Sequence, residues 1–131
     1  MTTAESTTAI DDATFARYQQ AWSDGDVDTI VALMTPDALY EASFGPEPYG
    51  QRFQGHDAIR AGVSAMFTAS PHRSTHEYGE RYTFGDHGFS TWSSTSFDAD
   101  RNPVATVHGC DFYEFKDGLV AKKIAFRKAR P

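Results

Sequence analysis

The chain has 131 residues, a formal net charge of −6, and 40% apolar and 14% aromatic residues. This length allows one hydrophobic core, and the acidic balance argues against binding to nucleic acid or to acidic membrane lipid. Cys110 is the single cysteine, which excludes an internal disulfide and a thiolate metal cluster. The small, polar residues 1–9 predict a flexible tail before a single domain over residues 10–131, and the absence of a recognisable targeting or membrane segment predicts a cytoplasmic protein.

The first third of the chain has mainly helical patterns. Aromatic residues at helical spacing predict a helix over residues 11–24. A cap at Asp26 predicts a short second helix, with Met34 on its apolar face and Pro36 as its stop. A third helix is expected to end before Pro71.

The segment between the second and third of these helices has a weaker pattern. Residues 38–44, "ALYEASF", alternate and predict a strand, whereas the Pro and Gly residues of 45–50 predict a long, mobile connection. Phe44, Tyr49 and Phe53 in and around this connection can either form an apolar lid or pack the loop down.

The rest of the chain has the period of strands, which are expected at residues 73–84, 89–97, 104–115 and 119–127. Helices followed by hairpin-linked strands indicate an α+β domain. We therefore expect a cone-shaped, curved antiparallel sheet with about three N-terminal helices packed on its concave face, enclosing a pocket.

The last two strands allow a register to be predicted. If "KDG" is a three-residue turn with Gly118 in the left-handed conformation, Phe115 lies opposite Leu119 and Asp111 lies opposite Lys123. A two-residue turn would instead shift the pairing by one residue and move every side chain to the other face.

Alternation along this hairpin assigns side chains to two faces of the sheet. Small residues near Asp111, namely Gly109, Ala121 and Ala125, would leave room for a ligand. The opposite face would carry an apolar stripe that needs a cover, and a homodimer through the sheet face is the expected cover. This stripe consists of Val120, Ile124 and Phe126.

Asp111 stands out because aspartate is a poor strand former and is costly to bury. Apolar neighbours would raise its pKa and make it a proton donor, whereas a nearby Lys123 would hold it ionised as a proton acceptor. A structural pair between Asp111 and Lys123, with no chemistry, is the other interpretation.

The histidines and Trp92 have less specific patterns. His76 lies early in a strand that can line the pocket, and it either acts as an acid/base group or faces outward. His108 has the opposite parity to Asp111 and is expected to face away from the pocket, toward a dimer partner. Trp92 is expected to pack the sheet, and no histidine spacing predicts a metal site.

Several segments taken together resemble the nuclear transport factor 2-like superfamily, in its SnoaL-like and ketosteroid-isomerase-like branch. The resemblance covers residues 13–128 and rests on "FARYQQAWSDGDVDTIVALMTPDALYEASFG", "FQGHDAIRAGVSAMF" and "GCDFYEFKDGLV". It implies the cone fold and a homodimer, and it is compatible with isomerases, polyketide cyclases, dehydratases, epoxide hydrolases and non-catalytic ligand binders.

The resemblance to ketosteroid isomerases assigns some residues and not others. Tyr18 and Asp111 match the tyrosine and the aspartic acid of the oxyanion hole. The position of the catalytic base holds Ala42, and Glu41 lies one residue earlier, on the opposite face of a regular strand. Gly109 occupies the arginine position of the Arg-x-Asp strand of epoxide hydrolases, so neither activity is favoured.

The sequence thus predicts a cofactor-independent acid/base enzyme of the cyclase, isomerase or dehydratase type. Its substrate would be an apolar, carbonyl-bearing small molecule such as a polyketide or a steroid-like ring system. Asp111, Tyr18 and His76 are the candidate catalytic residues, although the helical spacing of Tyr18 also fits a core residue. The alternative is a non-catalytic ligand-binding domain. The remaining candidate pocket residues are Glu41, Lys123, Trp22, Tyr113, Val63 and Phe67.

Overall fold

The computed structural model describes residues 10–69 and 72–129, so the predicted tail at residues 1–9 lies outside the described residues. Three helices accompany a curved, unclosed sheet of six strands. The strand order is β2-β1-β6-β5-β4-β3, and all neighbours are antiparallel except β1 and β6. The elements are α1 (Asp12–Asp24), α2 (Val27–Ala32), β1 (Met34–Glu47), β2 (Gly50–Gln54), α3 (His56–Ala69), β3 (Thr75–Phe84), β4 (His87–Phe97), β5 (Pro103–Lys116) and β6 (Leu119–Arg127).

Helix α1 follows its prediction closely. The Asp11 side chain caps its first turn by accepting a 2.7 Å hydrogen bond from the Thr14 backbone N–H. Gly25 ends it in the left-handed conformation with φ of 70°. The buried face carries the aromatic residues that predicted the helix, which fixes one wall of the interior.

Helix α2 ends two residues before Met34, which the sequence pattern wrongly placed on its apolar face. Met34 instead begins β1 and pairs with Val120 of β6. The β1–β6 ladder is irregular between Met34 and Leu39, so Pro36 fits inside a strand where regular pairing is interrupted. The proline thus marks a ladder irregularity and not a helix stop.

The predicted mobile connection at residues 45–50 is also wrong, because residues 45–47 end β1, residues 48–49 form a tight turn and Gly50 begins β2. Glu47 pairs with Gly50, which has φ of 81° and no room for a Cβ beside the Ala42 carbonyl. Phe53 stacks on Tyr40 with ring centroids 5.8 Å apart, so this aromatic side chain packs the hairpin down.

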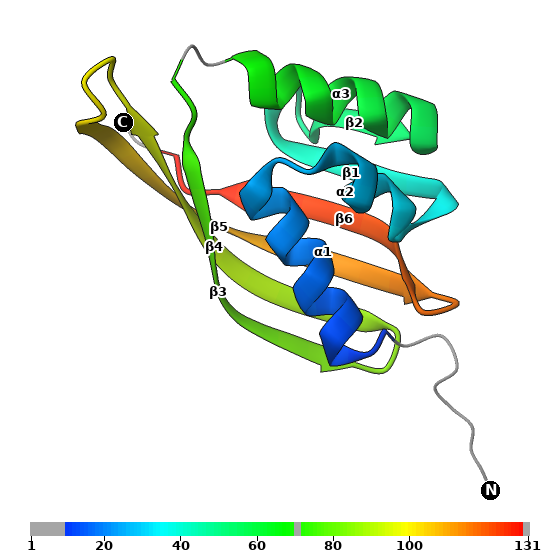
Figure 1. The fold of residues 1–131 in the computed structure, drawn as a ribbon. Coiled ribbons are helices and arrows are strands. Elements are labelled where there is room, and N and C mark those ends of the chain that lie inside the picture. The colour runs from blue at the N-terminus through cyan, green and yellow to red at the C-terminus, as the bar shows by residue number, and fades with distance from the viewer. Residues whose placement is uncertain (1–9, 70–71, 130–131) are drawn as a thin grey trace, which may run out of the picture.

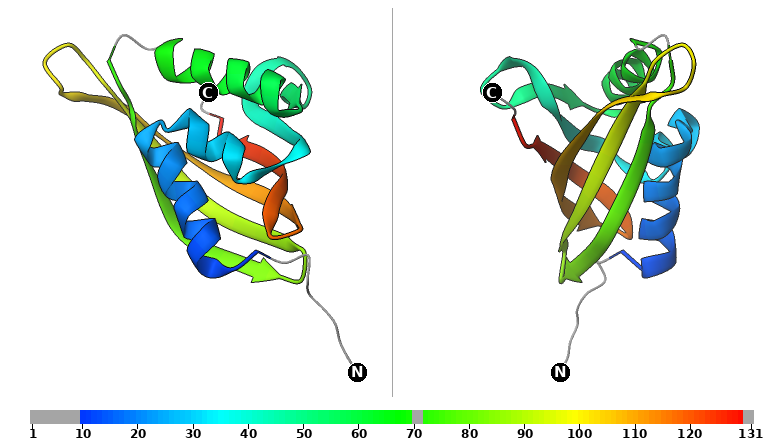
Figure 2. Two further views of the ribbon diagram at one scale, coloured as in Figure 1. Left: turned by 45° about the vertical axis from the view of Figure 1, so that its right-hand side comes forward. Right: turned by 90° about the vertical axis from the view of Figure 1, so that its left-hand side faces the viewer.

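The helices lie on one side of the curved sheet and form the predicted cone. Helix α1 contacts β3, whereas α3 contacts β1 and β2 at the other end of the sheet (Figures 1 and 2). The hydrophobic core fills the space between these layers. None of the helices in the described ranges is long and apolar enough to span a membrane.

Candidate active-site cavity

The hairpin that carries Asp111 has a different register from the predicted one. Its turn has two residues, with φ of 56° at Asp117 and 77° at Gly118, and Lys116 pairs with Leu119. A bulge then leaves Ala121 without a partner. The bulge adds a second one-residue shift to the one that the two-residue turn introduces, and a total shift of two residues keeps the predicted faces for most of the hairpin.

The partners across the hairpin are therefore displaced by two residues from the predicted ones. Asp111 lies opposite Ala125, and Lys123 lies opposite Tyr113, its neighbour on the same face. The region before the bulge does change face, because Val120 pairs with Phe115 and is fully buried. Val120 is thus a core residue and not part of an outer stripe.

Asp111 is completely buried and its carboxylate is surrounded by donors. Oδ1 accepts a 3.0 Å hydrogen bond from Trp92 Nε1, and Oδ2 accepts one of 3.0 Å from the Tyr113 hydroxyl. The Lys123 ammonium lies 3.7 Å from Oδ2. Burial raises the pKa of Asp111, and the donors and the lysine charge oppose that rise. The protonated form of Asp111 is therefore favoured more in this interior than it would be in water.

A second layer of polar side chains holds Tyr113. Its hydroxyl lies 3.1 Å from Ser90 Oγ and 3.4 Å from Gln19 Nε2, and all three side chains are buried. Burial also raises the pKa of Tyr113, which keeps the phenol protonated as a donor to Asp111. This network fixes the carboxylate in the interior of the cone.

Trp92 does more than the sheet packing that the sequence predicts. It lies opposite Gly109, and its indole ring fills the space that a side chain at Gly109 would occupy: a Cβ there would be 2.3 Å from Trp92 Cζ2. The sequence analysis expected Gly109 to leave room for a ligand, but the space beside it holds the Trp92 ring, which donates to Asp111.

Lys123 is 3% exposed and lies between aromatic rings. Its Nζ is 3.3 Å from the centroid of Trp22 and 5.3 Å from that of Tyr40, distances typical of cation–π contacts. Burial lowers the pKa of Lys123 to about 8, and the Asp111 charge only partly opposes this.

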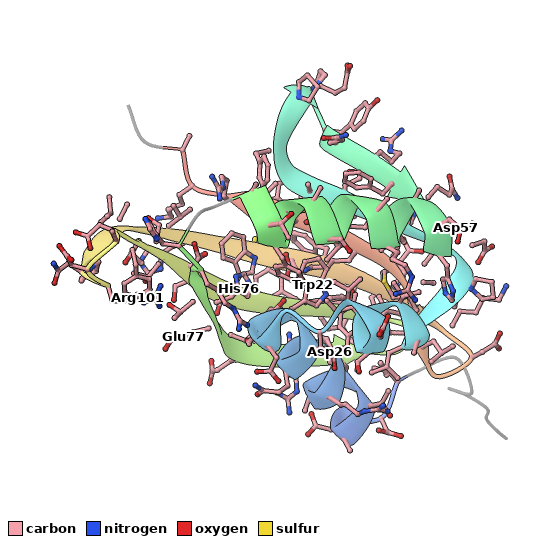
Figure 3. All side chains as sticks on the ribbon, turned by 45° about the horizontal axis from the view of Figure 1, so that its top comes forward. Trp22, Asp26, Asp57, His76, Glu77 and Arg101 are labelled. Carbon is pink, nitrogen blue, oxygen red and sulfur yellow. The ribbon has the colours of Figure 1, made fainter. Side chains whose placement is uncertain are left out.

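His76 reaches the same interior from β3. In Figure 3, His76 and Trp22 both lie between the helices and the sheet. Burial and the Lys123 charge lower the pKa of His76 to about 4, so the ring is neutral near pH 7. Its Nε2 is buried and has no hydrogen-bond partner among residues 10–69 and 72–129.

These side chains line one cavity of about 430 Å³. The buried residues Trp22, Asp111 and Lys123 form its floor, and the exposed Phe44 and Arg127 mark its mouth. The Arg127 guanidinium lies 5.3 Å from the Phe44 ring centroid at this mouth. The cavity is thus an aromatic chamber with an acid and an amine at the closed end, a size suited to a small organic ligand.

The structure brings together five of the predicted site residues in the cavity lining and leaves four outside it. Asp111, His76, Lys123, Trp22 and Phe67 line the cavity. Of the four outside, the buried Tyr18 hydroxyl donates to Met34 Sδ at 3.6 Å, and the Glu41 carboxylate pairs with Arg52 at 2.7 Å. Val63 packs in the core, and Tyr113 donates a hydrogen bond to Asp111 without lining the cavity.

Sequence reasoning missed several members of this site. Trp92, Ser90 and Gln19 come from other elements than the hairpin, and their contacts depend on strand order. The available signal was Gly109, since a glycine in a strand interior marks the close approach of a neighbour. Among the described residues, no group of three His, Cys, Asp or Glu side chains could hold a metal ion.

Comparisons with known proteins identify the fold to which this cavity belongs. The chain matches solved structures of similar architecture: an NTF2-like protein of unknown function from Mesorhizobium loti (21% identity, 89% of each chain covered, TM-score 0.70) and a proposed ketosteroid isomerase from Kribbella flavida (18%, 91% of this chain and 78% of that one, TM-score 0.71). A proposed polyketide cyclase from Sinorhizobium meliloti is 25% identical, covering 86% of this chain and 93% of that one with a TM-score of 0.66. Among curated proteins, none matches the chain significantly.

The fold is therefore the NTF2-like α+β cone, as the sequence resemblance implied. The model of the SnoaL-like domain matches residues 15–123. The chain belongs to this SnoaL-like domain family, and the match includes Asp111 and Lys123 at the end of the cavity.

Proposed function

We propose that this protein is a cofactor-independent acid/base enzyme that acts on an apolar, carbonyl-bearing small molecule. The observation that carries the proposal is the buried pair of Asp111 and Lys123 at the closed end of an aromatic cavity. Aromatic walls favour a ring-containing ligand, and buried charged groups, which are costly to desolvate, occur most often at functional sites. The likeness to a proposed ketosteroid isomerase and a proposed polyketide cyclase supports the same class of chemistry.

Asp111 would move the proton in this reaction. In its ionised form it accepts a proton beside the substrate carbonyl, and its raised pKa makes it a stronger base than an ordinary aspartate. The Lys123 ammonium would lie close enough to stabilise negative charge on the carbonyl oxygen. Asp111 would thus replace the strand base that Ala42 cannot supply.

His76 would complete the site from β3, two strands away from Asp111 in the same sheet. Its unpartnered Nε2 belongs to a neutral ring, which can donate to or accept from a ligand oxygen. Tyr18 would act indirectly, because its hydroxyl is directed to Met34 and burial raises its pKa.

Ligand-induced thermal stabilisation tests this proposal, followed by an assay of the ligands that stabilise. We expect one class among steroids, aromatic polyketide intermediates and simple phenols to raise the Tm of the wild type. Asp111→Asn should retain binding and lose about a thousand-fold in turnover. Asp117→Asn, an exposed substitution in the turn of the same hairpin, serves as the control and should keep full turnover. Undiminished turnover in Asp111→Asn would refute the role of Asp111.

A second candidate function is a ligand-binding domain without catalysis. The observation that favours it is the full set of donors around Asp111, which would satisfy the carboxylate even if no proton moved. This function predicts that ligands stabilise the protein, that none is converted, and that Asp111→Asn changes affinity alone.

We further propose that the protein acts in the cytoplasm as a homodimer formed through the outer face of the sheet. Four aromatic side chains on this face form a row across β3, β4, β5 and β6, with successive ring centroids 5.2 to 6.4 Å apart. This outer aromatic row consists of Tyr82, Phe89, Phe112 and Phe126, and three of its members are about half exposed. The exposed His108 lies on the same side of the sheet, away from the cavity. Contiguous apolar surface of this kind is typical of an interface.

A further inference from the structure

Lys123 has an environment that an ordinary structural ion pair does not need. Its Nζ is 3.7 Å from the nearest Asp111 oxygen, which is longer than the roughly 2.7–3.2 Å of a well-formed hydrogen bond. Across the described ranges, no group accepts a shorter hydrogen bond from Nζ. The amine faces a cavity that is open to a small molecule, so it has unused bonding capacity where a ligand would lie.

The same environment favours the uncharged amine. Trp22 and Tyr40 enclose Nζ, and removal from water brings the pKa of this group to about 8. The adjacent Lys122 offers the contrast, because its side chain is 38% exposed on the opposite face and pairs with Glu114 at 3.4 Å. An amine that is partly deprotonated near neutral pH is a nucleophile, whereas an ordinary exposed ammonium is not.

We propose that Lys123 condenses with the carbonyl group of the bound substrate to form a covalent imine. This inference rests on the proposed function, since it requires that carbonyl compounds enter the cavity. It assigns Lys123 a covalent role beyond the stabilisation of charge by its ammonium. The nearby Asp111 supplies the proton transfers that the condensation needs.

The step balances with the groups at hand. Lys123 first gives a proton to the Asp111 carboxylate, and the free amine then attacks the carbonyl carbon, so that a C–N bond forms and the C=O π bond breaks. One proton moves from nitrogen to oxygen, and Asp111 returns its proton to the same oxygen, which leaves as water. The products are a protonated imine on Lys123 and an ionised Asp111.

This intermediate accounts for the absence of the strand base. A protonated imine withdraws electrons from the adjacent carbon more strongly than a carbonyl group does, so the neighbouring C–H is acidified. The regenerated Asp111 carboxylate, held by Trp92 and Tyr113, then lies beside that carbon and accepts its proton. Hydrolysis reverses the condensation and releases the product and the free lysine.

Benzoylacetone and pentane-2,4-dione test the inference directly, because a free amine condenses with a 1,3-diketone to give a stable enaminone with loss of one water. The wild-type protein is treated with each diketone at pH 7 and pH 9 and then analysed by intact mass and peptide mapping. We expect a single early adduct on Lys123, formed at least ten-fold faster than any adduct on Lys122, and a new near-ultraviolet absorption of the enaminone.

Three variants sharpen this test. Lys122→Arg should keep the adduct, whereas Lys123→Met and Lys123→Arg should lose it. Lys123→Arg retains the positive charge beside Asp111 and cannot form the enaminone, so it separates the covalent role from the electrostatic one. Thermal unfolding of each variant checks that the fold is kept, and the mapping on the wild type does not depend on any variant.

The outcomes also separate this inference from the proposed function. Labelling of Lys123 no faster than that of Lys122, or no labelling of Lys123 by either diketone at pH 9, would overturn the imine. If Trp fluorescence still reports binding of the diketone in that case, acid/base chemistry at Asp111 stands without a covalent step. Absence of both binding and labelling would count against the cavity as a carbonyl site as well.

Discussion

The two faces of the sheet each depart locally from the usual distribution of side chains. The inner face buries an acid and a lysine, Asp111 and Lys123, whereas the outer face exposes the outer aromatic row. Phe112 follows Asp111 in the chain and is 48% exposed, while Asp111 is 0% exposed. Buried charges and exposed aromatic rings both cost stability in an isolated chain, so each face is consistent with the contact proposed for it: a ligand inside and a second copy of the chain outside.

The largest effect should come from breaking the inner pair. Asp111→Ala leaves the Lys123 ammonium buried without its partner and is expected to lower the free energy of unfolding by about 3 to 5 kcal/mol at pH 7. Adding Lys123→Met removes the orphaned charge and should recover most of this loss. Urea denaturation of the two single variants and the double variant measures the coupling.

The pH dependence of this loss provides a check on its cause. The deficit of Asp111→Ala should shrink as the pH rises to about 8, because without the Asp111 charge the folded-state pKa of Lys123 lies below the wild-type value of about 8 and the amine becomes neutral. A deficit that is the same at pH 7 and pH 9.5 would indicate lost packing and not an unpaired charge.

The next effect concerns His76 in the cavity wall. The unfolded chain binds a proton near the ordinary histidine pKa of 6.5, whereas the folded protein binds it only near 4. The unfolded state therefore takes up more protons in this window, and stability is lost as the pH falls through it, by up to about 3 kcal/mol. The difference between wild type and His76→Phe in thermal unfolding from pH 7 to pH 4 should show this loss, and His108→Gln on the outer face should behave as the wild type.

A smaller effect is expected from the hydroxyl group behind Asp111. Tyr113→Phe removes one donor to the buried carboxylate and should cost about 1.5 kcal/mol in the free energy of unfolding. Tyr82→Phe, which removes an exposed hydroxyl from the outer face, should cost less than about 0.5 kcal/mol. Equal losses in the free energy of unfolding for both variants in chemical denaturation would show that the hydrogen bond from Tyr113 to Asp111 adds no more stability than an exposed hydroxyl.

The smallest effect on the folded chain should come from the outer face itself. Phe112→Ser replaces a half-exposed ring, so it should change the stability of the monomer by less than about 0.5 kcal/mol. The same substitution should convert the proposed dimer into a monomer in analytical ultracentrifugation. An unchanged dimer would place the interface elsewhere, and a wild-type monomer at all concentrations would refute this use of the outer face.

The sequence predicted the elements and the fold better than it predicted the contacts. Periodicity identified α1 and the last four strands, because their apolar residues repeat at helical or strand spacing. Residues 45–50 were missed because Pro and Gly occur in hairpin turns as well as in loops. The composition of that segment could not distinguish the two, since the difference depends on pairing with β2.

The candidate site was only partly visible in the sequence for a related reason. Alternation correctly put Asp111 and Lys123 on one face, although the predicted turn was one residue too long and the bulge was not foreseen. Trp92 lies nineteen positions from Asp111 along the chain, and its hydrogen bond exists only because β4 pairs with β5. Local sequence patterns predict the face of the sheet on which a side chain lies, whereas the partners of a buried carboxylate depend on strand order.

The unpaired residue in β6 has a consequence for how this protein can tolerate insertions and deletions. Loss of Ala121 would remove the bulge and leave the Val120–Phe115 and Lys122–Glu114 pairs adjacent in a continuous ladder. Lys123 and Ala125 would then keep both their partners in β5 and their inward direction. A deletion of one codon would thus straighten the strand and leave the residues of the chamber in place.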